Sequence, residues 1–144
     1  MTRRGGRLVM TTWRRLAENP WLSVGKEVAR AWLPKPGPGA IGCGPGPFSL
    51  ADPDVVREVL LRAGYTEVAI SPCAATTRVG VSLEDAVDFQ LAIGPAGEIV
   101  REAGAQAVAV LPDLRCHMAR ALEPFLTAEG VLMPSAAWVV HARA

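Results

Sequence analysis

The sequence predicts an α/β fold built from three strands with covering helices. Three strand-like runs, near residues 7–13, 66–72 and 135–143, are separated by stretches of helical periodicity. The clearest unit extends from Gly42 to Ile70, where a loop, a helix, a tight turn and a strand follow one another. Alternating helices and strands are typical of α/β domains, although a doubly wound sheet usually contains more than three strands.

The first predicted strand occupies residues 7–13. Residues 8–10, Leu-Val-Met, form a short continuous apolar run, which is typical of a strand buried on both faces of a parallel sheet. A helix is expected next, because Asn19 is a suitable N-cap and Pro20 suits the first helical position. Gly25 weakens this helix by about 1 kcal/mol relative to alanine.

The next segments are a loop and a second helix. Residues 34–47 contain five prolines and five glycines, so they are predicted to be a loop, either a flexible linker or a lid over a pocket. Asp52 is a good N-cap with Pro53 at the first helical position, and Gly64 can take the left-handed conformation that ends a helix.

The second and third strands frame a helical insertion. The second strand is expected from Thr66 to Thr77, with Pro72 either ending its regular part or forcing a bulge. The third runs from residue 131 to residue 143. The second strand has clear apolar positions at Val68, Ile70 and Val79, whereas the apolar residues of the third alternate imperfectly.

Residues 82–130 are predicted to form the helical insertion. Ser82 is a suitable N-cap, and Asp85 three residues later nearly completes a capping box. Pro112 and Pro124 are each expected at a helix start or a kink, because proline removes a hydrogen bond inside a helix.

Composition limits the class of protein. The chain has 144 residues, half of them hydrophobic, so it is one domain or part of one. A net charge of +1 argues against binding nucleic acid through a basic face. No window approaches the ~20 apolar residues of a membrane helix. Cys43, Cys73 and Cys116 form no C-x-x-C pair, which favours unpaired thiols in a reducing cytoplasm over a zinc ribbon or a redox site.

Residues 47–70, PFSLADPDVVREVLLRAGYTEVAI, resemble a late segment of class I S-adenosylmethionine-dependent methyltransferases. In that family a Pro-Phe-x-Leu loop enters a helix that ends in Ala-Gly-[Phe/Tyr], and a strand comes directly after it. GGRLVM at residues 5–10 is similar to the family's turn into its fifth strand, and Trp13 with NPW at residues 19–21 is similar to the segment after that strand. AWVVHAR at residues 137–143 resembles the closing strand. The resemblance spans nearly the whole chain but only the C-terminal half of the family's domain.

The resemblance implies a partial Rossmann-like methyltransferase fold over residues 1–144, with the last two strands as antiparallel neighbours. It also implies S-adenosylmethionine as the cofactor and a small molecule as the methyl acceptor. The family's first four strands, its Gly-rich turn and its ribose-binding carboxylate have no counterpart here, so we expect no activity from this chain alone. The alternative is a non-enzymatic remnant or an interaction module.

The sequence GCGPG at residues 42–46 has the spelling of a cofactor-binding turn. A genuine turn follows a buried strand, opens a helix and has an acidic residue about 20 positions later. Residues 36–41 are too rich in proline and glycine for an interior strand, and residues 71–73 contain no carboxylate. We therefore expect Gly42, Gly44 and Gly46 to lie in an exposed loop that binds no nucleotide.

Trp13, Trp21 and Phe48 are the candidate substrate-binding residues. Trp13 is expected at the carboxyl end of a strand and Phe48 in a loop, where open α/β sheets bind ligands. Core packing is the alternative role for all three. His117 is assigned to the surface or to helix packing, and His141 to a strand face. No catalytic, cofactor-binding or metal-ligating residue is predicted.

The first strand is also a candidate contact surface. If the chain forms half a sheet, residues 8–10 expose unpaired backbone groups and an apolar surface on that strand. We expect self-association through the first strand, with Val9 on the contact surface.

Overall fold

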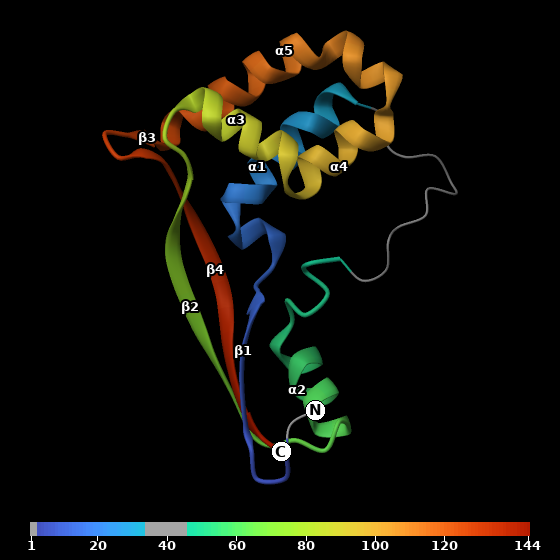
Figure 1. The fold of residues 1–144 in the computed structure, drawn as a ribbon, viewed down its shortest axis with the longest axis vertical. Helices are drawn as coiled ribbons and strands as arrows, with labels where there is room; N and C mark the ends of the chain where they lie inside the picture. The colour runs from blue at the N-terminus through green and yellow to red at the C-terminus, as the bar shows by residue number, and fades with distance from the viewer. Residues whose placement is uncertain (1–2, 34–45) are drawn as a thin grey trace. The chain divides into compact units, whose positions relative to one another are not determined.

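A computed structural model describes residues 3–33 and 46–144, so most of the predicted loop at residues 34–47 lies outside the described residues. The fold is mixed α/β with a four-stranded antiparallel sheet (Figure 1). The chain divides into two compact units. Unit 1 contains residues 1–19, 42–75 and 135–144, and unit 2 contains residues 20–41 and 76–134.

The strands are β1 (Arg7–Trp13), β2 (Thr66–Gly80), β3 (Leu126–Thr127) and β4 (Gly130–Arg143). β4 lies between β1 and β2, and β3 pairs with the start of β4. In the antiparallel ladder of β1 and β4, Arg7 lies opposite Arg143 and Trp13 lies opposite Ala137.

β2 is also antiparallel to β4. The Thr66 hydroxyl donates a hydrogen bond to the Arg143 carbonyl, and the Ser135 hydroxyl donates to the Ala75 carbonyl. From Thr66 to Ala75 along β2, the hydrogen-bonded residues of β4 run backward from Arg143 to Ser135, so the two strands are antiparallel. The predicted positions of the three strands and the antiparallel pairing of the last two are confirmed.

Two strand predictions are wrong. The sheet has a fourth strand, the two-residue β3, which is too short to carry a periodic pattern. Of the two roles expected for Pro72, ending the regular part of β2 is wrong, because β2 continues to Gly80, whereas the bulge stays a prediction. Because β2 is an edge strand, a residue without an N–H group need not break its ladder with β4.

The expectation that β1 is buried on both faces is also wrong. Its residues alternate between exposed and half-buried, and Val9 is 61% exposed. Leu8 and Met10 pack into the core of unit 1, whereas Val9 points to the opposite face. An apolar run in an antiparallel edge strand can therefore have one exposed face, as antiparallel sheets commonly do.

Helix α2 (Pro53–Arg62) covers one face of the unit 1 sheet (Figure 1). The Asp52 carboxylate accepts a hydrogen bond from the Asp54 N–H group, and Gly64 has φ +86°, so both predicted helix boundaries are confirmed. Val56 and Leu60 are buried against β4. Burial of each such side chain contributes about 1.5–3 kcal/mol, which anchors the helix to the sheet.

Unit 2 is mainly helical, with α1 (Pro20–Trp32), α3 (Leu83–Ala92), α4 (Gly94–Ala103) and α5 (Ala105–Leu122). The 3₁₀ helix η2 (Glu123–Phe125) leads from α5 into β3. α1 packs against α4 and α5. Fully buried residues of this core include Leu114, Met118 and Leu122 of α5 and Met133 of β4. A methyl group at Gly25 would clash with the side chain of Gln90, so close packing explains the glycine that weakens α1.

The N-cap signal placed the start of α3 correctly. The Ser82 hydroxyl accepts a hydrogen bond from the Asp85 N–H group, which confirms the N-cap of α3. Pro112, however, lies inside α5 and not at a start. Proline has no N–H group, so Pro112 leaves the carbonyl of Val108 without its usual helical donor. Both residues are exposed, so water can supply the missing hydrogen bond.

Candidate functional site

The polar contacts at the carboxyl end of β1 centre on Asn19. After β1 the chain turns through the 3₁₀ helix η1 (Leu16–Glu18), which brings the Asn19 side chain back to the strand ends. Its amide nitrogen donates to the carbonyls of Arg14, Arg15 and Ala136 at 3.3, 3.2 and 3.1 Å. Its oxygen accepts from the Ala136 N–H group at 2.9 Å, and the residue is fully buried. Asn19 therefore joins the end of β1 to β4, and we call these four hydrogen bonds of its side chain the Asn19 clamp.

Arg14 lies beside this clamp. Its guanidinium forms an ion pair with Glu18, and its central carbon lies 4.6 Å from the centroid of the Trp138 ring. The Glu18 carboxylate also accepts a hydrogen bond from the Arg15 N–H group at 3.2 Å. Stacking of a guanidinium on an indole is worth about 0.5–2 kcal/mol and fixes the orientation of the side chain.

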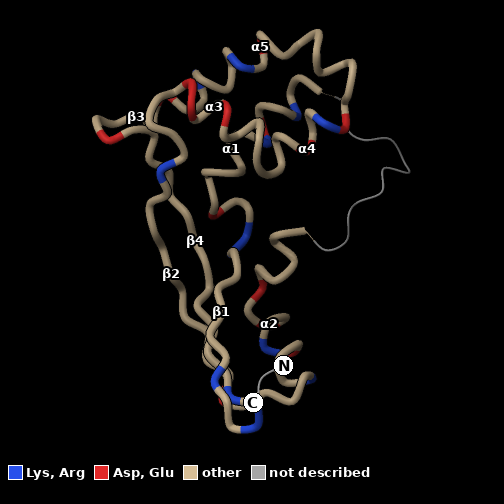
Figure 2. Tube along the Cα trace, in the orientation of Figure 1, with Lys and Arg blue, Asp and Glu red and all other residues tan. Residues whose placement is uncertain are grey.

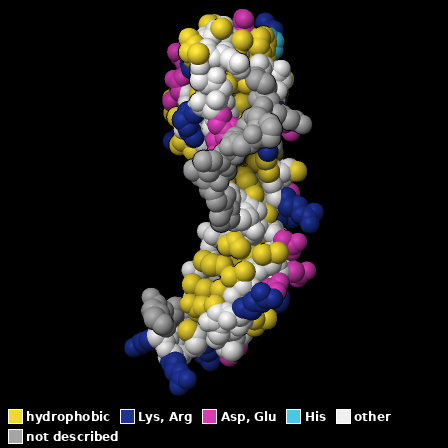
Figure 3. Space-filling model, turned by 90° about the vertical axis from the view of Figure 1, so that its right-hand side faces the viewer, with side chains coloured by type: hydrophobic (Ala, Val, Ile, Leu, Met, Phe, Trp, Pro, Cys, Tyr) yellow, Lys and Arg dark blue, Asp and Glu magenta, His cyan; other side chains and the backbone are white. Residues whose placement is uncertain are grey.

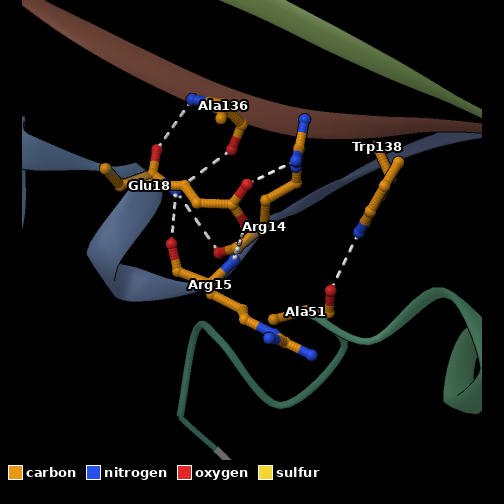
Figure 4. Close-up of polar contacts among 7 residues, drawn as sticks. Arg14, Arg15, Glu18, Ala51, Ala136 and Trp138 are labelled. Carbon is orange, nitrogen blue, oxygen red and sulfur yellow. Dashed lines mark hydrogen bonds and ion pairs between the residues drawn. The ribbon is translucent and has the colours of Figure 1, made fainter.

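Trp138 connects β4 to the segment that precedes α2. Its indole N–H group donates to the Ala51 carbonyl at 2.8 Å (Figure 4). The Ala51 N–H group in turn donates to the Phe48 carbonyl at 3.1 Å, within the turn at residues 47–50. The backbone of the Phe48 turn is thus fixed to the sheet through two successive hydrogen bonds.

Two buried donors in this region are unpartnered. The Thr12 hydroxyl and the Nε–H group of Arg14 make no hydrogen bond within the part of the chain that the structure describes. Thr12 lies in β1 and Arg14 directly follows its last residue, where its backbone N–H group still donates to Ala136 of β4, so the two side chains leave the same face. Buried polar groups are nearly always satisfied, so these two donors are an exception within the described residues.

The structure separates the three predicted substrate-binding residues. Trp13 is half-buried at the end of β1, and Phe48 is half-buried in its turn, both in unit 1. Trp21 belongs to unit 2, is 9% exposed and lies with its ring centroid 6.2 Å from that of Phe89. Its carbonyl accepts a hydrogen bond from Gln90. Trp21 thus packs in the core of unit 2, and a binding role for the three residues stays a prediction.

The remaining candidates have structural contacts or exposed positions. The His117 ring lies 4.8 Å from that of Trp32, and its Nδ1 atom lies 2.9 Å from the Asp113 carbonyl oxygen, in agreement with the assigned packing role. His141 is exposed on β4. Cys73 and Cys116 are free, exposed thiols.

The described part of the chain offers neither a metal-ligand cluster nor a membrane-spanning helix. Over residues 3–33 and 46–144, no group of three or more His, Cys, Asp and Glu side chains is placed to hold a metal ion. No helix in those ranges is both long and apolar enough to cross a membrane.

The predicted glycine loop is only partly described. Gly42, Gly44 and Cys43 lie outside the described residues, and Gly46 is exposed. The sequence showed neither the clamp by Asn19 nor the stacking of Arg14 on Trp138. An asparagine before a proline predicts a helix cap, and the bond to Ala136 spans 117 positions of the chain.

Comparison with known proteins adds no assignment, since no protein-family model and no curated protein sequence matches this chain.

Replacement of Asn19 tests whether the clamp, and not a helix cap, is its main contribution. We expect Asn19→Ala to lower the free energy of unfolding by about 1–3 kcal/mol, because it leaves the partly buried Ala136 N–H group unsatisfied. Asn19→Asp is the informative partner, since aspartate caps helices as well as asparagine but cannot donate to the three carbonyls. Urea unfolding should show both variants destabilised, and wild-type stability of Asn19→Asp would contradict the clamp.

Proposed function

We propose that this chain is the acceptor-side, C-terminal portion of an S-adenosylmethionine-dependent methyltransferase that acts on a small molecule. The observation that carries the proposal is the antiparallel pair of β2 and β4. The resemblance implies such a closing pair. Its first member, β2, begins within the run at residues 47–70, whose turn, capped helix, turn and strand lie in the implied order. A partial Rossmann-like fold is part of the same proposal.

The end of β1 would hold the acceptor. Trp13 and Phe48 offer aromatic surface, and the unpartnered donors of Thr12 and Arg14 suit a hydroxyl, carbonyl or carboxylate oxygen of the molecule to be methylated. Arg14 is already oriented by Glu18 and Trp138, so a bound oxygen would meet a fixed donor. Methyl transfer needs little acid–base chemistry when positioning supplies most of the rate, so the lack of a catalytic dyad does not oppose this role.

Cofactor binding tests which half of the domain this chain represents. We expect isothermal titration with S-adenosylmethionine or S-adenosylhomocysteine to show no saturable binding, because the resemblance covers only the half without the cofactor turn. Micromolar binding that Gly44→Ala abolishes would instead assign the cofactor turn to residues 42–46 and contradict the proposal.

A nearly isosteric substitution, Thr12→Val, tests the acceptor site. Thr12→Val removes only the unpartnered hydroxyl, so we expect unchanged or slightly higher stability, by up to ~1 kcal/mol. In a thermal-shift screen of small hydroxyl, carbonyl and carboxylate compounds, we expect hits for the wild-type chain that Thr12→Val loses. Thr11→Val is the matched control, because Thr11 points to the opposite face of β1. Equal binding by Thr12→Val and Thr11→Val would contradict an acceptor site here.

Strand pairing is a second candidate function, in which the chain is a non-enzymatic interaction module. The Arg14 N–H group donates to the Ala136 carbonyl, and the Ala144 N–H group donates to the Gly6 carbonyl. In an antiparallel ladder hydrogen-bonded pairs recur at every second residue, so the even-numbered residues of β1 bond to β4. The backbone groups of Val9 and Thr11 therefore point away from β4 to an edge that no other described strand covers.

This edge fits an antiparallel pairing of two copies. A twofold axis at Met10 places Val9 of one copy opposite Thr11 of the other, and it keeps the Arg7 side chains at opposite ends of the contact. Pairs of β-branched residues stabilise strand contacts by about 0.2–1 kcal/mol, whereas opposed like charges destabilise them. Val9 is exposed, as such a contact requires.

Size exclusion with light scattering tests the pairing. We expect the wild-type chain to self-associate and Val9→Lys to be monomeric, because the lysine places charge on the contact surface. Val108→Lys is the matched control, since Val108 is 73% exposed on α5, in unit 2. A wild-type monomer whose stability Val9→Lys leaves unchanged would rule out association through β1.

A further inference from the structure

A basic hollow lies on the sheet of unit 1, at the end of the ladder between β1 and β4. It has a volume of about 230 Å³, and its charged or exposed lining residues are Arg7, Val9, Glu67, His141 and Arg143. Residues directly opposite each other in a ladder share a face, so Arg7 and Arg143 lie on the same face as Val9 and His141. This is the face away from the core that α2 covers.

The two arginines are opposed like charges. Arg7 lies directly opposite Arg143 in the register, an arrangement that destabilises a sheet unless an anion lies between the charges. Arg143 forms an ion pair with Glu67 at 3.5 Å. Arg7 has no ion pair with any residue in the described part of the chain, so its charge is uncompensated.

Glu67 is held in an unfavourable backbone conformation. Its φ of +52° makes it the one non-glycine residue with positive φ within the described ranges, and such a conformation costs about 1–2 kcal/mol. Glu67 is the single carboxylate that lines the hollow. It compensates one arginine and leaves a net positive charge beside His141.

The surrounding chain adds to this positive potential. Arg3 and Arg4 lie in the exposed turn before β1, and residues 3–13 contain no Asp or Glu. Figure 2 shows the arginines at this end of the ladder, and Figure 3 shows their side chains gathered at the same end of the surface. An anion is therefore attracted to this end of unit 1.

We propose that the hollow binds a small phosphate-bearing molecule, a site distinct from the proposed acceptor end of β1. A phosphate monoester carries close to two negative charges, so it can pair with Arg7 and compete with Glu67 for Arg143, and arginine can donate to it through two parallel hydrogen bonds. The volume lies below the ~300–1,000 Å³ typical of pockets for larger ligands. It therefore suits a phosphate group and a small attached body.

The site is tested with inorganic phosphate at constant ionic strength, monitored by ¹H–¹⁵N NMR of the full chain. We expect saturable shifts at Arg7 and Arg143, and a roughly fivefold weaker affinity in Arg7→Gln, as for loss of one partly exposed ion pair. Arg62→Gln is the matched control, because Arg62 is exposed in the same unit and pairs with Glu58. Equal affinities of these two variants would overturn the proposal.

Glu67→Gln provides a test in the opposite direction. It removes the carboxylate that competes with phosphate for Arg143, so we expect tighter phosphate binding than in the wild-type chain. Thermal unfolding of each variant shows that the fold is retained. Unchanged or weaker phosphate binding by a folded Glu67→Gln variant would contradict the assigned site.

A short single-stranded oligonucleotide separates this site from a general polyanion surface. We expect it to bind no more tightly than phosphate, since the hollow holds one phosphate group. Tight oligonucleotide binding that depends on Arg3 and Arg4 but not on Arg7 would overturn the proposal in favour of a nucleic-acid contact.

Discussion

Strand β4 is the central strand of unit 1, because β1 pairs with one of its edges and β2 with the other. The other elements of unit 1 are positioned relative to this strand. Helix α2 packs on Val140 and Ala142 of its inner face. Asn19 bonds to both backbone groups of Ala136, and Trp138 fixes the segment before α2. Because these contacts converge on one strand, a change in its register would move the core and the polar cluster together. A one-residue slip would also turn Val140 away from α2.

The parts of the fold that the sequence predicted well depend on local backbone preferences. Asp52 and Gly64 fix the ends of α2 through a side-chain hydrogen bond and a positive φ, and both effects involve residues only a few positions apart. The burial of β1 could not be predicted in this way. Leu8, Val9 and Met10 are equally apolar, and which of them is exposed depends on the antiparallel pairing with β4 and on α2, which packs on one face only.

The candidate site shows the same division between local and distant information. A strand end and the loop after it indicated Trp13 and Phe48, and both lie in unit 1. Trp21 is aromatic and belongs to the NPW run of the resemblance. Residues of α3, such as Gln90 at a separation of 69 positions, nevertheless place it in the core of unit 2. The clamp by Asn19 depends on a contact of still longer range. Local sequence therefore identified residue types suited to binding, and tertiary contacts decided which of them remain available.

The geometry of β1 allows the proposed roles to coexist. Side chains alternate across a strand, so Thr12 and Arg14 leave one face while Arg7 and Val9 leave the other. The backbone groups of Val9 and Thr11 point along a third direction, in the plane of the sheet and away from β4. A ligand held by Thr12 and Arg14, a phosphate at Arg7 and a strand added at the open edge therefore use different groups of one short segment. Substitutions at Thr12 and at Arg7 can separate the acceptor site from the phosphate site, because the two side chains leave opposite faces of the strand and their replacement leaves the backbone ladder with β4 in place. A charge at Val9 acts on both the hollow and the open edge, because Val9 lines the hollow and its backbone groups face that edge.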